Sequence, residues 1–215
     1  MNVVLILLTF VTGLVDAVTY LGLGHVFAAN MTGNVIVLGF ALVGTGEISA
    51  TASLVSLGAF MIGGLLSAHL AHVLQRTRHR WIVITLLGET VLLSVAAALS
   101  AAGPGFASDH ATVALLAVAM GMRTVTVRRL GISEISTTVL TTTLGGLAMD
   151  VYLRRSPLGP EGLRLAAVLA MLGGAAAGAV LLRNGAALVL GLAASLPLIL
   201  TVSYIAVVLR AGVDD

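Results

Sequence analysis

Cysteine is absent from this 215-residue chain, and all 11 basic residues are arginine, so lysine is absent as well. Without cysteine the chain has no disulfide, no thiol nucleophile and no zinc–thiolate site, which is compatible with any compartment. Aromatic residues make up only 4% of the sequence, and there is no aromatic-rich basic stripe on which bases could stack. The net charge of +2 therefore does not indicate a nucleic-acid partner.

Charge of either sign is also scarce. Charged residues make up 9% and hydrophobic residues 59% of the chain, and the mean hydropathy is +1.11. A soluble domain carries about 25% charged residues, so this chain cannot cover itself with a polar surface, and lipid is its predicted solvent. The same composition excludes disorder. Met1–Val11 lacks a basic n-region and the apolar run continues to Leu23, which predicts a first membrane helix rather than a signal peptide.

Eight apolar segments can be distinguished, since a helix that spans a bilayer needs about 20 mostly apolar residues. They are Val3–Gly24, Met31–Gly44, Ala50–Leu74, Trp81–Ala102, Ala111–Val127, Ile135–Leu153, Leu163–Leu182 and Ala186–Leu209. The second is too short to span by itself, and the sixth is rich in hydroxyl groups, so short or broken helices are expected at Met31–Gly44 and Ile135–Leu153. The predicted fold is all-α: a polytopic transmembrane helix bundle of six to eight membrane segments, in a single membrane domain over 1–215.

The bundle is predicted to consist of two related halves, approximately 1–103 and 104–215. Gly13 and Gly121 occupy corresponding places, and each begins a stretch with polar residues late in a membrane segment. Each half continues with a loop, a threonine-containing stretch and further helices. Four segments in each half imply parallel repeats, whereas an odd number of true spans implies inverted repeats, and the sequence leaves both open.

Arginine positions orient the chain, because positively charged loops favour the cytoplasmic side. Arg76–Arg80 and Arg128–Arg129 lie on one side if two spans separate them, and that side is predicted to be cytoplasmic. Arg154 and Arg155 then fall on the opposite side if Ile135–Leu153 spans fully. This conflict weakens if that segment is a re-entrant or broken helix.

Asn30-Met-Thr-Gly-Asn34 is a polar, helix-breaking segment between two apolar runs, and Val139-Leu-Thr-Thr-Thr143 is its weaker counterpart in the second half. At membrane depth these groups must face protein or a water-lined cavity, because lipid cannot satisfy their hydrogen bonds. Paired segments of this kind are typical of a transporter's binding site. The predicted substrate-binding residues are Asn30, Thr32, Gly33, Asn34, Thr137, Thr138 and Thr141.

A half-helix is expected to follow the first polar segment, with Asn30 or Thr32 as its cap. Its N-terminus would hold an anionic or polar group by the helix dipole, and Gly33 would let the backbone approach closely. In the alternative interpretation, these polar groups only satisfy each other at a tight helix crossing.

Three charged residues, Asp16, Glu89 and Arg123, fall within predicted membrane segments. An aspartate at the centre of a membrane helix costs about 2.5–3.5 kcal/mol on insertion scales, so such a residue is usually paired, protonated or part of an ion path. Arg123 is the natural partner of Asp16 in the first case. Glu89 either pairs with Arg123 instead of Asp16 or carries a proton. The three residues are therefore predicted to serve an ion pair or proton coupling.

Signatures of metal binding and of catalysis are missing. His69 and His72 share one helix face, but no carboxylate or cysteine accompanies them in sequence, so no metal site is predicted. The chain also lacks the Gly-x-Ser-x-Gly elbow, the Walker A loop, the Gly-x-Gly-x-x-Gly fingerprint and the His-Glu-x-x-His motif. We therefore expect neither an enzymatic activity nor a cofactor.

Several motifs resemble those of the YoaK-like bacterial membrane proteins, a family of small multi-pass proteins grouped as a domain of unknown function. They are Gly13–Tyr20, His25–Phe27, Ala29–Asn34, Leu38–Gly39, Ala119–Met122, Arg128–Arg129 and Thr137–Thr138 ahead of Thr141. The resemblance covers essentially the whole chain and implies the same multi-pass fold, but it implies no established activity. The sequence departs from the family pattern at Arg123-Thr124, where the family usually has Gln-Asn, and at Thr142, where it usually has glycine.

Together these features predict a protein of the bacterial cytoplasmic membrane that acts as a secondary transporter or channel for a small polar or anionic solute. The solute site is expected near the midplane, between Asn30–Asn34 and Thr137–Thr143. Besides the lipid bilayer and the solute, a second copy of the chain is an expected partner. The rival interpretation is a membrane scaffold or partner-binding protein that transports nothing.

Overall fold

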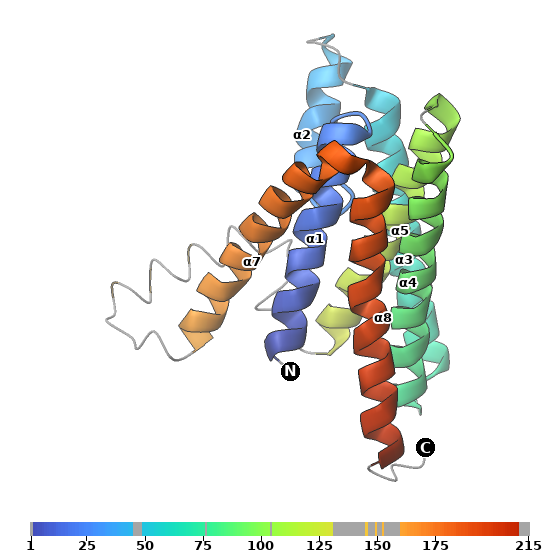
Figure 1. Ribbon diagram of the computed structural model, residues 1–215, viewed down its shortest axis with the longest axis vertical. Coiled ribbons are helices and arrows are strands. Elements are labelled where there is room, and N and C mark those ends of the chain that lie inside the picture. Colours follow the sequence, from blue (N-terminus) through green and yellow to red (C-terminus); the bar gives the residue numbers. More distant parts are fainter. Residues whose placement is uncertain are drawn as a thin grey trace.

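The computed structural model describes residues 2–44, 49–75, 77–103, 105–130 and 160–210, together with residues 145, 149 and 152. This part of the chain is helical and contains no strand (Figure 1). The helices are α1 (Asn2–Gly22), α2 (Met31–Leu42), α3 (Ala50–Val73), α4 (Arg78–Ala101), α5 (Phe106–Arg129), α7 (Pro160–Leu181) and α8 (Ala186–Arg210), with a short 3₁₀ helix, η3 (Leu182–Asn184), between the last two.

Six of these helices are long and apolar enough to cross a membrane, and α2, with 12 residues, is not. The predicted all-α membrane bundle is therefore confirmed, including the short second helix. The largest boundary difference is at α5, which begins at Phe106 rather than at the predicted Ala111, followed by α4 and α7, which begin at Arg78 and Pro160 rather than at Trp81 and Leu163. Hydropathy marks where a helix enters lipid, whereas these helices begin in the polar residues before that point. The predicted segment Ile135–Leu153 lies outside the described residues.

Helix directions follow from two small apolar clusters at opposite ends of the bundle. One joins the start of α1, the end of α5 and the start of α7 through Leu5, Val127, Leu163 and Ala167. The other joins the end of α1 to the starts of α3 and α5 through Leu23, Val26, Ala52 and Val113. Consequently α1, α4 and α7 run in one direction and α3, α5 and α8 in the other, as Figure 1 shows.

The most extensive helix contacts pair α1 with α7 and α3 with α5, and glycine permits both. A Cβ added to Gly174 would overlap the carbonyl oxygen of Phe10 in α1, and one added to Gly63 would overlap that of Val118 in α5. Small residues at such crossings let the backbones touch, which is how helices associate in lipid. Gly13 and Gly121 lie in these same two contacts and also face backbone atoms, of α7 and α3 respectively.

The main core lies where α1, α4, α5 and α8 meet. Its large, fully buried side chains include Val15, Leu93, Leu116, Met120 and Leu190. Exposed apolar side chains instead cover the outer faces of α3 and α7, among them Leu65 and Leu172. These outer faces are the lipid-facing surface of the bundle.

The predicted grouping of arginines is consistent with these helix directions. The α3–α4 connection and the end of α5, with Arg128 and Arg129, lie at the same end of the bundle (Figure 1). The end of α5 and the start of α7 lie at this end as well. Arg154 and Arg155 lie outside the described residues, so the predicted conflict over their side of the membrane stays a prediction.

Candidate functional site

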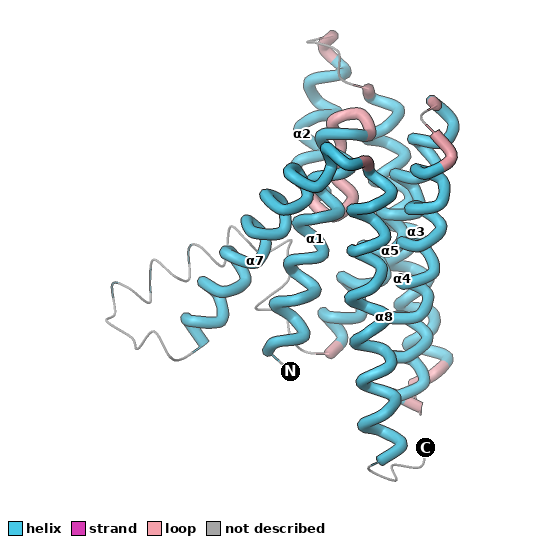
Figure 2. Tube along the Cα trace, viewed as in Figure 1, coloured by secondary structure: helices cyan, strands magenta, loops and turns pink. Residues whose placement is uncertain are grey.

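The connection between α1 and α2 folds back onto α1. The backbone N–H groups of Ala28 and Ala29 each donate a hydrogen bond of 2.9 Å to Oδ1 of Asp16. Asp16 stands six residues before Gly22, so the connection returns along α1 by about 9 Å. Figure 2 draws this connection as a loop beside the end of α1. Helix α2 therefore starts beside α1, below the C-terminal end of that helix.

The Asp16 carboxyl group is 5% exposed and lies at the N-terminal end of this half-helix. The backbone N–H of Asn30 also interacts with it. Its second oxygen, Oδ2, is buried, and within the described part of the chain it has no hydrogen-bond partner. The predicted pairing of Asp16 with Arg123 is wrong, because the guanidinium pairs with Glu89, and the bonded oxygen of Asp16 accepts backbone N–H groups.

Asn34 holds the folded-back loop against α3. Its Oδ1 accepts a hydrogen bond from the Phe27 N–H (2.8 Å), and its Nδ2 donates to the Phe27 carbonyl (2.6 Å) and to Ser56 Oγ (3.0 Å). Ser56 Oγ donates to the same Phe27 carbonyl at 2.6 Å. Asn34 is completely buried. In this conformation both amide hydrogens of the side chain are used within the protein, and neither is available to a solute.

The other residues of the polar segment are differently placed. Asn30 is the N-cap of α2, as predicted, and its Oδ1 accepts a hydrogen bond of 3.3 Å from the N–H of Gly33. Asn30 and Thr32 are exposed. A Cβ on Gly33 would meet the ring of Phe27 at 2.8 Å, so only glycine fits beside that ring.

The second predicted half of the site, Thr137, Thr138 and Thr141, lies outside the described residues, as do Thr142 and Thr143. The convergence of the two polar segments therefore stays a prediction.

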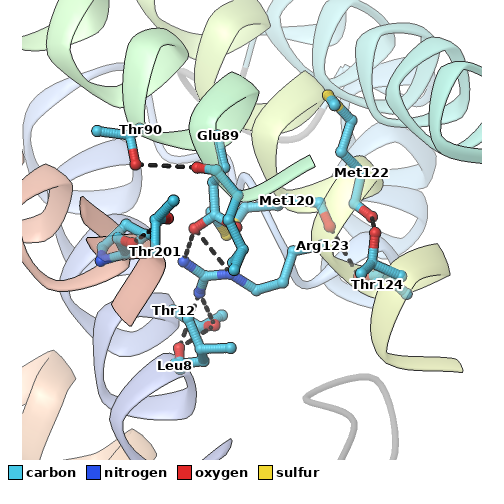
Figure 3. Close-up of polar contacts among 12 residues, drawn as sticks. Leu8, Thr12, Glu89, Thr90, Met120, Met122, Arg123, Thr124 and Thr201 are labelled. Atoms are coloured by element: carbon cyan, nitrogen blue, oxygen red, sulfur yellow. Dashed lines mark hydrogen bonds and ion pairs between the residues drawn. The ribbon is translucent and has the colours of Figure 1, made fainter. Parts of the chain in front are cut away.

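Arg123 is the centre of a second buried polar group, between α1, α4 and α5 (Figure 3). Its Nε donates to Glu89 Oε1 at 3.0 Å, and its Nη2 pairs with the same oxygen. Its Nη1 donates to the carbonyl oxygen of Leu8 at 2.8 Å and to Oγ1 of Thr12 at 2.9 Å. Arg123 is 8% and Glu89 2% exposed. Of the two predicted alternatives for Glu89, the structure has the ion pair with Arg123.

Besides Thr12, two threonines lie beside this ion pair without binding it. Thr90 of α4 donates to the Leu86 carbonyl, and Thr201 of α8 donates to the Pro197 carbonyl. Both are buried and appear beside the ion pair in Figure 3. Each hydroxyl is satisfied by its own helix, one turn earlier. These hydroxyls need no second partner to be buried, so they can reorient towards another group at little cost.

Sequence reasoning missed Thr12, Ser56 and the backbone groups of Phe27, Ala28 and Ala29. Thr12 and Ser56 are ordinary hydroxyl residues within apolar helices, and nothing in the pattern separates them from hydroxyls that bond their own helix. Backbone groups of a loop carry no residue-type signal at all. The motifs His25–Phe27 and Ala29–Asn34 were the only indication in the sequence that this loop has a defined structure.

Comparisons with known proteins agree with the membrane fold. The family model described as "Protein of unknown function (DUF1275)" matches residues 4–203. The UPF0700 transmembrane protein YoaK of Bacillus subtilis (strain 168) is 37% identical over 151 residues, which cover 70% of this chain and 67% of that protein. No solved structure matches the chain. With its six apolar helices, the chain is a multi-pass membrane protein.

Proposed function

The chain belongs to the DUF1275 family of YoaK-like transmembrane proteins, and from that premise we propose that it is a secondary transporter or channel for a small polar or anionic solute. The observation that carries the proposal is the loop before α2, which binds a buried carboxylate inside a bundle of oppositely directed helices. We interpret the short helix that follows it as a re-entrant half-helix. Broken helices of this kind supply the solute and ion sites of many transporters.

The arrangement of the spans supports the same function. In the first half α1, α3 and α4 alternate in direction, and in the second half α5, α7 and α8 alternate in the opposite sense. Three spans in each half, with reversed directions, fit an inverted repeat. The reciprocal glycine contacts support it as well, because Phe10 stands three residues before Gly13 and Val118 three residues before Gly121. Two such halves can rock against each other around a fixed central site.

The proposed solute site lies between Asn30–Asn34 and Thr137–Thr143, with Asn30, Thr32 and Gly33 at its first side and Thr137, Thr138 and Thr141 at its second. Asp16, Glu89 and Arg123 supply ion pairing or proton coupling. Since the sequence has no nucleotide-binding loop, the energy for transport comes from an ion gradient or a separate ATPase. The chain carries out no enzymatic reaction of its own in this proposal, and a homodimer completes the transport unit.

We place the protein in the bacterial cytoplasmic membrane. The end of the bundle that carries Arg128, Arg129 and the α3–α4 connection faces the cytoplasm, because that end has more arginine than the other end, where Arg183 lies. In this orientation the N-terminal end of α1 is cytoplasmic and the re-entrant α2 enters from the opposite side.

Solute uptake into proteoliposomes tests the proposal. The protein is reconstituted in a defined orientation, and uptake of a panel of small labelled solutes, both organic anions and neutral polar molecules, is measured with and without a proton gradient. We expect gradient-dependent uptake of at least one anionic solute. Protein-free liposomes and liposomes with the Arg123→Gln variant are the controls. Equal uptake by all three preparations over the whole panel would contradict the proposal.

A membrane scaffold is the second candidate, and the packing around Asn34 favours it. Asn34 is 0% exposed, and both hydrogens of its amide bond within the protein. In a scaffold this amide joins the loop to α3 and binds no solute. In a scaffold the whole Asn30–Asn34 segment stays packed under all conditions. In a transporter, the same segment opens to water in part of the cycle.

A further inference from the structure

Two acidic side chains, Asp16 and Glu89, are buried among the described residues. Glu89 is bound by Arg123, whereas the carboxyl group of Asp16 bonds no cationic side chain. The Oδ1 atom of Asp16 accepts two backbone N–H groups, while Oδ2 is buried without a hydrogen-bond partner among the described residues. A buried carboxylate needs a compensating positive charge, and the partial charge at a helix N-terminus supplies only part of one.

We propose that Asp16 is a proton-binding site and that proton occupancy controls whether residues 26–34 are fastened to α1. In the ionised state Oδ1 accepts strong, charge-assisted hydrogen bonds from Ala28 and Ala29. A proton on Oδ2 removes the charge and weakens both bonds. The folded-back loop and the start of α2 are therefore held at high pH and released as the pH falls.

A proton fits this position better than a larger cation. Sodium or calcium needs a shell of several oxygen ligands, and among the described residues no group of three or more histidine or acidic side chains is arranged for a metal. Asp16 Oδ2 offers one buried oxygen that has no hydrogen-bond partner among the described residues. One oxygen is sufficient for a proton.

The other titratable and charged groups near this part of the bundle have different positions. Tyr20 near the end of α1 and His25 in the loop pack edge to face. Glu89 of α4 and Arg123 of α5 bind each other, and Asp109 lies in the first turn of α5, followed by His110. α7 from Leu165 to Leu181 and α8 from Ala186 to Ser203 carry no titratable residue, and Arg183 lies in η3 between them. None of these groups makes a hydrogen bond or ion pair with Asp16 among the described residues.

The inference rests on the proposed transport function, since it makes the proton the coupling ion that opens one side of the site. It can be tested without transport, by hydrogen exchange of residues 24–34 in lipid nanodiscs from pH 9 to pH 5. After correction for the intrinsic pH dependence of exchange, the Ala28 and Ala29 amides should lose about tenfold protection at low pH, because two charge-assisted bonds weaken. The α3 residues around Ala59 serve as the internal reference and should not change.

Variants assign the effect to one residue. Asp16→Asn should give the low-pH exchange rate at every pH, and the matched control Asp109→Asn should keep the wild-type response. If Asp16→Asn does not fold, Asp16→Glu retains a carboxyl group and should keep the response with a displaced midpoint. The proposal is overturned if the wild-type protein shows no pH-dependent exchange at Ala28 and Ala29. It is also overturned if Asp109→Asn, and not Asp16→Asn, abolishes that dependence. So does a response to replacing sodium by choline at constant pH, which would identify the cation as sodium.

The two proposals fail separately. A pH-dependent loop in a protein that moves no solute leaves the proton site in place and removes the transport function. Solute uptake with a loop that does not respond to pH leaves transport in place and removes Asp16 as the coupling site.

Discussion

Arg123 of α5 and Glu89 of α4 form an ion pair at the centre of the bundle, where one is 8% and the other 2% exposed. The guanidinium also reaches α1, through the Leu8 carbonyl and Thr12 Oγ1. Three helices from both halves of the chain are thereby tied by one side chain. A buried pair of this kind contributes little net stability compared with apolar packing, but loss of one partner leaves an uncompensated charge in a low-dielectric interior.

Removing either partner alone should destabilise the protein strongly. For Arg123→Met and for Glu89→Leu we expect a loss of about 3–5 kcal/mol in the free energy of unfolding, because each leaves the other charge buried and unpaired. The double variant should recover most of that loss, since no charge remains. Unfolding in mixed micelles with increasing denaturing detergent measures all three. Additive losses in the double variant would show that the two residues do not act as a pair.

The helices of this fold could be predicted from the sequence because hydropathy reports lipid contact directly. The hydrogen-bond partners of Asp16 could not be predicted in this way. Sequence offers only other side chains as partners, and Arg123 was the natural partner within the predicted membrane segments, whereas the structure uses the N–H groups of Ala28 and Ala29. A loop that folds back onto its own helix creates such donors, and residue types do not encode them. Asn34 was predicted as a solute ligand, and in the structure its amide joins the loop to α3. The motif alone does not distinguish these two roles.

Loss of the Asn34 amide should lower the stability of the folded-back loop between α1 and α2. Asn34→Ala leaves the partly buried Phe27 N–H without its partner, and a fully buried donor left unsatisfied costs about 1–3 kcal/mol, so we expect a loss at the lower end of that range. Ser56→Ala should cost less, because the Phe27 carbonyl still accepts a hydrogen bond from Asn34. Chemical denaturation gives both values, and protease sensitivity of the 23–30 connection reports the local effect. An Asn34→Ala protein as stable as Ser56→Ala would contradict this account.

Close backbone contact between α3 and α5 predicts different outcomes for two glycines of the same helix. Gly63→Ala should destabilise the protein by about 1–3 kcal/mol, the usual range for overpacking, because its Cβ overlaps the Val118 carbonyl. Gly58→Ala has open space around its Cβ and should be neutral or stabilise the helix by about 0.5–1 kcal/mol. Thermal unfolding in one detergent compares them directly. Equal effects of the two variants would show that the crossing can separate freely.

Water access at the start of α2 distinguishes the transporter from the scaffold, and a chain without native cysteine is suited to the measurement. Thr32 is exposed on the protein surface, Leu65 is 66% exposed on the outer face of α3, and Ser67 is completely buried at the α3–α5 contact. Each is replaced singly by cysteine, and the rate of reaction with a membrane-impermeant maleimide is measured in membranes. Only a thiol in water ionises and reacts quickly.

If Thr32 lines an aqueous path, Thr32→Cys should react at least about tenfold faster than Leu65→Cys, which faces lipid and cannot ionise. Ser67→Cys should not react, because packed backbone excludes the reagent. Adding a transported solute should slow the reaction at position 32 alone. A Thr32→Cys rate equal to that of Leu65→Cys would mean that the exposed face of α2 meets lipid, and the half-helix would then serve packing rather than passage.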